Sequence, residues 1–264
     1  MQHEFAITSI DWVVSNITYR DNLYSCYRNT TSSLIFGWYA SQPEPGVKGC
    51  DLWVEAKILR AMFGNERVDS YFKSHLSIVV DNPEVVYPNV NTVWAAFAKR
   101  FGTLMSLLNY KNLVLDYFYQ GMQEFYDDGV QYMEVRSVLA PICLTQDEEC
   151  NPLSIVDTAK VFKEAADQFA LDHPDNWCGL KIIYGPSRRV DPGTVTNYFD
   201  KAAQLVQELP DFILGFDMVG QEDLGRPLIE FLDEILAGIE TYPDLKVFFH
   251  AGETDWQGSP TDLV

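Results

Sequence analysis

The sequence contains no apolar run that approaches the roughly 20 residues a helix needs to cross a bilayer. Its first residues, Met1 to Phe5, also lack the basic segment followed by an apolar segment that marks a secretory signal peptide. From the sequence alone we therefore expect neither a membrane span nor a signal peptide.

Basic residues are scarce, because 19 Lys and Arg stand against 38 Asp and Glu, for a formal net charge of -19. This balance repels phosphate backbones, and the few basic residues are scattered along the chain, so we expect no nucleic-acid partner. The sequence has no G-x-x-x-x-G-K-S/T loop to hold the phosphates of a nucleotide. The composition favours a neutral or cationic small molecule as ligand.

The five cysteines form no C-x-x-C pair, which argues against a zinc knuckle and a thioredoxin-type redox motif. Cys26 and Cys50 lie near two N-x-T sequons, which begin at Asn16 and Asn29. Disulfides and N-linked glycans are both made in an oxidising, glycosylating compartment, and this combination fits such a compartment.

The composition is that of a globular chain, since 264 residues with 47% hydrophobic side chains suffice for a core in one or two domains. In the second half, short runs of β-branched and aromatic residues alternate with amphipathic helical stretches. The predicted strands are 131–139, 179–186, 213–220 and 246–251. The predicted helices carry apolar stripes over 155–169, 195–209 and 228–239.

Strands joined by single crossover helices must run parallel, and a parallel sheet covered by helices is either doubly wound or closed into an eight-stranded barrel. The strand pattern leaves both architectures open. Asp217 and Gly220 end one of the predicted strands, and His250 and Glu253 end the next. Barrel enzymes place their chemistry at such carboxyl ends.

The first half is less regular. We predict a helix over 5–16 and two aromatic-rich helices within 91–128. The segment between these helices, roughly 17–86, holds Cys26 and Cys50, the two sequons (the first of which begins at Asn16) and a proline-rich loop. It is typical of an inserted subdomain held by a Cys26–Cys50 disulfide. The predicted organisation is therefore residues 1–16 as the start of a barrel domain, 17–86 as the insert and 87–264 as the rest of the barrel domain.

The sharpest chemical signal is Phe248-Phe249-His250-Ala251-Gly252-Glu253, a buried strand that delivers a histidine and then a carboxylate. Histidine is the commonest metal ligand, and a carboxylate three residues on is placed for proton transfer beside a metal. The alternative is a hydrogen-bonded histidine at a strand end followed by an exposed glutamate.

Two weaker signals accompany it. Gly220 ends a strand in Gly-Phe-Asp-Met-Val-Gly, where backbone could approach a ligand, although a plain turn followed by an acidic loop explains the same pattern. The alternation in Tyr132-Met133-Glu134-Val135-Arg136 places Glu134 and Arg136 on one face, which favours an internal ion pair between them.

Taken together, YMEVR at 132–136, KIIY at 181–184, GFDMVGQED at 215–223 and FFHAGETDWQG at 248–258 resemble the adenosine deaminase superfamily. The resemblance spans nearly the whole chain and is strongest to the secreted branch, the adenosine-deaminase-related growth factors. It implies a (β/α)8 barrel, deamination of adenosine and deoxyadenosine to inosine-type products and ammonia outside cells, a homodimer, and one zinc ion held by an H-x-H pair, by the histidine of HAGE and by a later aspartate.

Carried onto this sequence, the resemblance makes His250 a zinc ligand, Glu253 the acid that protonates the purine ring, and Gly220 a backbone contact to the base. It also matches Trp94, Phe97 and Phe101 to residues that line the ribose and base pocket. Glycosylation at Asn16 and the cysteine-bearing insert belong to the secreted branch.

The sequence departs from the family pattern at both ends. The H-x-H-D motif corresponds to Met1-Gln2-His3-Glu4, so only His3 of that pair is kept as a zinc ligand, and Glu4 stands where an aspartate binds the ribose. The sequence stops at Val264, before the catalytic histidine and the metal-binding aspartate of the family, so about strands two to five of the barrel are expected. Ser187 stands where the secreted branch carries a substrate-contacting histidine. With two of four ligands, we expect weak or no zinc binding and no turnover by this chain alone.

A non-enzymatic role is the alternative, in which the insert over 17–86 binds a cell-surface receptor or a glycan and the barrel serves as its scaffold. This alternative is considered because Cys26, Cys50 and both sequons are present while the metal site is incomplete.

Overall fold

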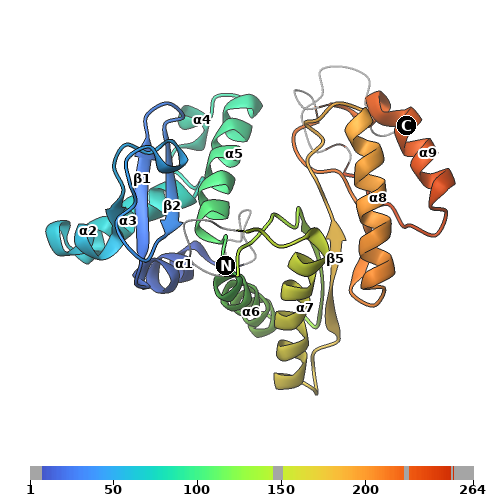
Figure 1. Ribbon diagram of the computed structural model, residues 1–264, viewed down its shortest axis with the longest axis horizontal. Helices are drawn as coiled ribbons and strands as arrows, with labels where there is room; N and C mark the ends of the chain where they lie inside the picture. Colours follow the sequence, from blue (N-terminus) through green and yellow to red (C-terminus); the bar gives the residue numbers. More distant parts are fainter. Residues whose placement is uncertain (1–7, 145–150, 223–225, 251, 253–264) are drawn as a thin grey trace. The chain divides into compact units, whose positions relative to one another are not determined.

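The computed structural model describes residues 8–144, 151–222, 226–250 and 252 (Figure 1). The chain divides into two compact units, one of residues 1–128 and 142–153 and the other of residues 129–141 and 154–264. Within the described ranges, no helix is long and apolar enough to span a membrane. The predicted domain boundaries between residues 16 and 17 and between residues 86 and 87 stay predictions.

The first unit combines a small antiparallel sheet with helices. Its elements in chain order are α1 (Ile10–Asn16), η1 (Ile17–Tyr19), β1 (Leu23–Arg28), β2 (Ser33–Trp38), η2 (Val47–Gly49), β3 (Val54–Glu55), α2 (Ala56–Phe63), α3 (Asn65–Leu76), α4 (Pro83–Val86), α5 (Val90–Leu107) and α6 (Lys111–Asp127). The sheet order is β2-β1-β3, and α5 packs along β2 (Figure 1). The two helices predicted within 91–128 are confirmed as α5 and α6.

The predicted disulfide between Cys26 and Cys50 is present, with 6.2 Å between the two Cα atoms. It ties β1 to the residue that follows η2, and both cysteines are buried in a small cluster with Tyr24, Tyr39 and Trp53. Cys143 is disulfide-bonded as well, whereas Cys178 is a free, exposed thiol. The main core of the unit is separate and is centred on the edge-to-face pair of Phe36 and Phe72.

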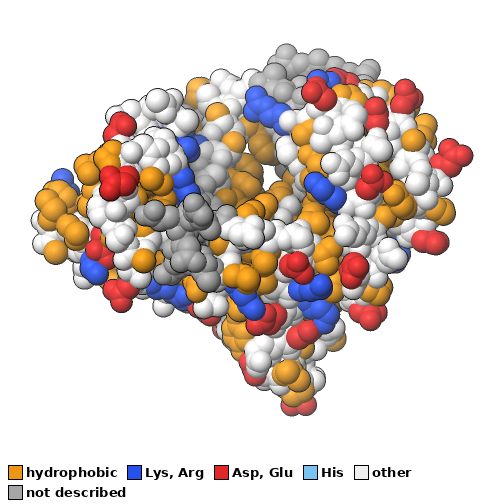
Figure 2. Space-filling model, viewed as in Figure 1, with side chains coloured by type: hydrophobic (Ala, Val, Ile, Leu, Met, Phe, Trp, Pro, Cys, Tyr) orange, Lys and Arg blue, Asp and Glu red, His pale blue; other side chains and the backbone are white. Residues whose placement is uncertain are grey.

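Helix α2 leaves part of its apolar surface uncovered by the first unit. Ile58, Met62 and Phe63 are 46%, 67% and 50% exposed, and Figure 2 shows hydrophobic side chains gathered over this helix. Its inner side carries Ala56 and Arg60, which are buried.

The second unit is a parallel α/β structure. Its elements are β4 (Tyr132–Ser137), α7 (Ile155–Asp172), β5 (Gly179–Tyr184), α8 (Gly193–Glu208), β6 (Ile213–Phe216), η3 (Leu228–Phe231) and α9 (Leu232–Thr241). The strands pair in the consecutive order β4-β5-β6, all parallel. Helix α7 contacts β5 and α8, and α8 contacts β6 and α9 (Figure 1). Three of the predicted strands and all three predicted helices are confirmed.

Of the fourth predicted strand, 246–251, the described residues form an isolated bridge and not a strand. Val247 forms a parallel bridge with Phe216, supported by hydrogen bonds from Phe216 N–H to the Lys246 carbonyl (2.9 Å) and from Phe248 N–H to the Phe216 carbonyl (2.8 Å). The backbone of residues 246–248 therefore continues the sheet beside β6 and leads to His250.

Gly215 in β6 makes this approach possible. A Cβ atom at position 215 would collide with the carbonyl oxygen of Lys246 and with the ring of Phe248. Since the obstacle includes backbone, a side chain here would force the two strands apart.

Candidate functional site at the carboxyl ends of the parallel strands

Polar residues meet where β5, β6 and the 246–248 segment end. Asp217 directly follows β6, and its N–H donates to the Tyr184 carbonyl at the end of β5 (2.8 Å). Beyond the strands, Ser187 and Val219 still pair in a parallel bridge. The carboxyl ends of parallel strands share one edge of a sheet, so the topology places Asp217, Arg188 and His250 together.

Asp217 and His250 form the centre of this site. Nδ1 of His250 lies 2.6 Å from Oδ2 of Asp217, and the N–H of His250 donates to Oδ1 of the same carboxylate (3.0 Å). Asp217 is completely buried, while the His250 side chain is 29% exposed. One buried carboxylate thus fixes both the backbone and the ring of the histidine.

Further donors complete the shell of Asp217. Arg136 donates from Nε to Oδ2 (2.6 Å), and Met218 N–H donates to Oδ1 (2.6 Å). Burial alone would raise the pKa of Asp217, but the hydrogen bonds from His250 and Arg136 outweigh it and hold the pKa below its ordinary value. Asp217 is therefore ionised at neutral pH and accepts hydrogen bonds at both oxygens.

The partner of Arg136 differs from the one predicted. We expected an ion pair with Glu134 on the same face of the strand, but Arg136 pairs with Asp217 and Glu134 accepts a hydrogen bond from the Tyr132 hydroxyl (2.9 Å). The physical reason is that Asp217 is a buried carboxylate, which gains more from a cation than the exposed Glu134 does.

Arg188 closes the site from the β5 side. This residue is fully buried, and its Nη2 atom donates to the carbonyl oxygens of His250 (2.7 Å) and Met218 (3.3 Å). Its own N–H donates to the Val219 carbonyl (2.9 Å). A single guanidinium therefore joins the segment after β6 to the residue that carries the imidazole.

Gly220 lies in the turn after β6 with a φ angle of +108°, a conformation that L side chains rarely adopt. A Cβ there would lie 4.0 Å from Ser187 Oγ and Arg188 Cγ, an ordinary contact. Backbone conformation rather than space explains the glycine. The next buried carboxylate, Glu222, accepts a hydrogen bond from Gly252 N–H (3.1 Å), so it holds the backbone at Gly252.

The imidazole of His250 suits metal ligation. Because a carboxylate only accepts, the neutral ring carries its proton on Nδ1 and presents a lone pair on Nε2. Metal-ligating histidines commonly donate their other ring nitrogen to a carboxylate in this way. Among the residues that the structure describes, no group of three or more His, Cys, Asp or Glu side chains could hold a metal ion.

The aromatic residues predicted to line the substrate pocket lie together on α5 in the first unit. Trp94 and Phe97 pack edge to face with ring centroids 5.4 Å apart, and Phe97 and Phe101 stack at 6.1 Å. All three are half-buried. Phe97 also lines an apolar cavity of about 440 Å³ with residues of the 78–93 segment.

Three predicted site residues, His3, Glu4 and Glu253, lie outside the described residues. Ser187 is exposed, and its hydroxyl accepts a hydrogen bond from Arg189 N–H (3.1 Å). The roles assigned to His3, Glu4 and Glu253 stay predictions.

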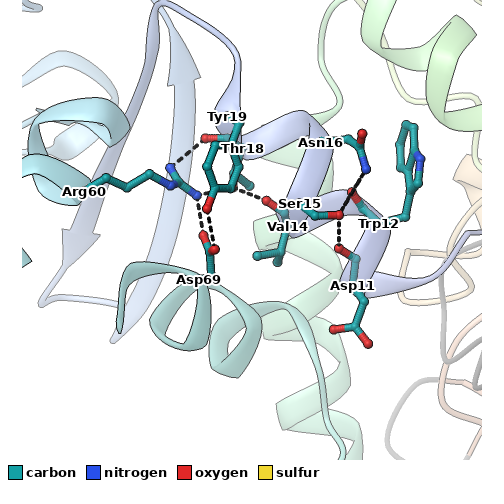
Figure 3. Close-up of polar contacts among 9 residues, drawn as sticks. All are labelled: Asp11, Trp12, Val14, Ser15, Asn16, Thr18, Tyr19, Arg60 and Asp69. Carbon is teal, nitrogen blue, oxygen red and sulfur yellow. Dashed lines mark hydrogen bonds and ion pairs between the residues drawn. The ribbon is translucent and has the colours of Figure 1, made fainter. Parts of the chain in front are cut away.

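Both sequons present an exposed asparagine. Asn29 lies in the turn between β1 and β2. Asn16 ends α1 and donates to the Trp12 carbonyl (3.1 Å), as Figure 3 shows. The threonine of that sequon, Thr18, is completely buried, and Arg60 donates to both its hydroxyl and its carbonyl (2.8 Å each). The fold thus uses the sequon threonine as a structural acceptor.

Sequence reasoning missed Arg188 and did not include Asp217 among the site residues. The position of Asp217 at a strand end was a usable signal, because it shares that edge with His250. Arg188 gave none, since it is one of two adjacent arginines in a loop and only the fold shows which is buried.

The curated proteins to which the chain is similar are adenosine deaminases. No family model matches the chain. The chain is 35% identical to adenosine deaminase 2-A of Danio rerio over 261 residues, which cover 98% of this chain and 51% of that protein. It is 34% identical to adenosine deaminase 2 of Homo sapiens (98% and 50%) and 35% identical to adenosine deaminase of Lutzomyia longipalpis (98% and 49%). The chain spans about half the length of these relatives.

Solved structures give weaker similarities. An arabidopsis N6-mAMP deaminase matches at 16% identity and a TM-score of 0.44, over 71% of this chain and 53% of that chain. A zinc-bound amidohydrolase from Burkhoderia ambifaria matches at 16% identity and a TM-score of 0.42, over 56% and 37%. Similarities at this level do not by themselves establish a shared architecture.

Proposed function

We propose that this chain, a homologue of the adenosine deaminase 2 proteins along 98% of its length, forms part of a zinc-dependent hydrolase that releases the 6-amino group of adenosine and deoxyadenosine as ammonia. The observation that carries the proposal is the Asp217–His250 pair, in which a buried carboxylate binds Nδ1 and leaves Nε2 available on a half-exposed ring. The homology alone would not locate the chemistry.

The fold supports a barrel. Consecutive parallel strands with α7, α8 and α9 in mutual contact are the arrangement found when all crossover helices lie on one face of the sheet, as in a (β/α)8 barrel. In a doubly wound sheet, the helices divide between the two faces. We infer that residues 87–264 contribute about strands two to five of such a barrel, that 1–16 begin it, and that 17–86 are an insert.

Each site residue has a proposed task. His250 and His3 are the zinc ligands that this chain supplies, and Glu253 transfers a proton to the purine ring. Glu4, Trp94, Phe97, Phe101 and Gly220 bind the nucleoside. When bound, zinc would supply Lewis-acid chemistry that makes water a nucleophile at neutral pH. Asp217 keeps His250 in the tautomer that can ligate.

An extracellular location follows from the same reasoning. The Cys26–Cys50 disulfide and the exposed asparagines of both sequons fit an oxidising, glycosylating compartment. We propose N-glycans at Asn16 and Asn29. The homodimer and the receptor implied by the resemblance stay predictions.

The test is zinc binding and ammonia release from adenosine by the purified chain. We expect Zn²⁺ to bind weakly through His250, so that His250→Gln reduces binding while His75→Gln, a change in the first unit, does not. We also expect no ammonia release by the chain alone. Zinc binding that is identical in the parent and His250→Gln would refute the metal role, and stoichiometric zinc with turnover would refute the expected inactivity.

A further inference from the structure

Arg188 is a buried cation whose hydrogen bonds the proposed chemistry does not use directly. Its side chain has no exposed surface, and its Nη2 atom contacts the carbonyl oxygens of His250 and Met218. Burying a guanidinium costs desolvation free energy, which its hydrogen bonds must offset.

Those contacts converge on one residue. His250 is held at three atoms: its N–H and Nδ1 by Asp217, and its carbonyl oxygen by Arg188. Asp217 fixes the ring and the N–H of His250 but makes no bond to its carbonyl oxygen. Arg188 supplies the bond at that carbonyl.

Arg188 is itself held in place by backbone hydrogen bonds. The Arg188 N–H donates to Val219, and Val219 N–H donates to the Pro186 carbonyl (3.0 Å), so the loops after β5 and β6 remain paired beyond the strands. The guanidinium then bridges from this paired base to His250. A side chain that is itself held by paired backbone restricts the residue it contacts more firmly than a side chain on a mobile loop would.

We propose that Arg188 is a positioning residue that fixes the main chain at His250 and thereby aims Nε2 of the imidazole at the metal. The inference rests on the proposed function, in which His250 is a zinc ligand. It assigns to Arg188 a share of the metal affinity that is separate from the share of Asp217.

The variants for the test are Arg188→Met, Arg188→Lys and the control Arg189→Met, which removes the exposed neighbouring guanidinium. The first readout needs no metal. In the ¹⁵N-histidine-labelled chain, two-bond ¹H–¹⁵N correlations and the low-field Nδ1 proton report whether the ring stays bonded to Asp217. The second readout is the Kd for Zn²⁺ alone, with His250→Gln defining the affinity that depends on the imidazole.

We expect Arg188→Met to broaden or lose the low-field proton and to weaken zinc binding at least tenfold, in line with the effect of other groups that orient metal ligands. Arg188→Lys should recover part of both, because an ammonium keeps the charge and can donate to the same carbonyls but stands on a shorter side chain than Nη2 does, and Arg189→Met should match the parent. A folded Arg188→Met chain with the parental proton signal and parental Kd would overturn the inference.

The outcomes are separable. If His250→Gln binds zinc as the parent does, the metal role of His250 fails, while the proton signal still decides whether Arg188 positions the ring. If Arg188→Met does not fold, as judged by near-ultraviolet circular dichroism, Arg188→Lys decides, and parental values of both readouts in that variant would overturn the inference.

Discussion

Asp217 holds His250 by two bonds from one carboxylate, at 2.6 Å to Nδ1 and at 3.0 Å from the backbone N–H. The two residues are 33 positions apart in the sequence and are brought together by the parallel pairing of β6 with the segment that leads to His250. The bond to the ring selects the tautomer of His250, and the bond to the backbone N–H fixes the position of the residue. Accepting both bonds at once requires Asp217 to be ionised.

Replacing Asp217 by Asn keeps the size of the side chain but leaves only one accepting atom. Either Nδ1 of His250 or the two backbone N–H groups at Oδ1 then lose their acceptor, so we expect the affinity for Zn²⁺ to fall about 10- to 100-fold. Isothermal titration with Zn²⁺ measures this. The exposed Asp211→Asn is the matched control and should leave the affinity unchanged. An unchanged Kd in Asp217→Asn would contradict the role given to this carboxylate.

Glu124 on α6 is a buried carboxylate that anchors the start of α1. It accepts hydrogen bonds from the Thr8 hydroxyl (2.6 Å) and the Ser9 N–H (2.9 Å), five and six residues after His3. Replacing it with Ala leaves these donors unpaired in the interior, at a cost of about 1–3 kcal/mol for each buried group. Urea unfolding should show a loss of about 3 kcal/mol. The exposed Glu84→Ala should change stability by less than about 0.5 kcal/mol, and a similarly small effect of Glu124→Ala would contradict the anchoring role.

Arg60 is the buried cation of the first unit. It donates to Thr18 and to Asp69 (2.6 Å), and its guanidinium lies 3.9 Å from the centre of the Tyr19 ring (Figure 3). Breaking a buried pair from one side costs about 3–5 kcal/mol, and because Asp69 is partly exposed we expect about 3 kcal/mol for Arg60→Met.

The control for Arg60 is Arg67→Met on the exposed side of α3, which should be close to neutral. Thermal unfolding followed by circular dichroism compares the two variants. If both shift the Tm equally, the loss reflects charge in general and not the contacts with Thr18 and Asp69.

The Cys26–Cys50 disulfide closes a loop with a sequence separation of 24. On the chain-entropy estimate, such a bridge stabilises the fold by about 3 kcal/mol. Cys50→Ser should therefore lower the free energy of unfolding by about that amount under oxidising conditions. Under reducing conditions the variant and the parent should converge. A persistent difference after reduction would show that packing of the Cys50 side chain, and not the cross-link, is responsible.

The periodic parts of the fold were predictable from the sequence, because each depends on local pattern. Apolar stripes gave α7, α8 and α9, β-rich runs gave β4 to β6, and aromatic helical spacing gave α5 and α6. The cysteine pair was also predictable from its place beside the sequons, although the segment around it does contribute to a large core, which Phe36 and Phe72 share. The choice of a barrel over a doubly wound sheet depended on family resemblance, because strand order is not written in local pattern.

The site was predictable only in part. His250 and Gly220 stand at strand ends and could be identified from their positions, whereas the partner of Arg136 could not. Glu134 is two residues away in sequence and Asp217 is 81, yet burial makes the distant carboxylate the one that the cation neutralises. Arg188 depends on the same kind of long-range information, since its acceptors are backbone carbonyls 30 and 62 positions away.

Gly215 sets the spacing on which the imidazole depends. Only a hydrogen atom separates this position from the main chain at Lys246, and four residues later that main chain delivers the ring to its carboxylate. Any larger residue would displace residues 246–248 away from β6, and His250 would be displaced with them. The reach of the candidate metal ligand is thus determined by a residue that has no side chain and lies outside the site.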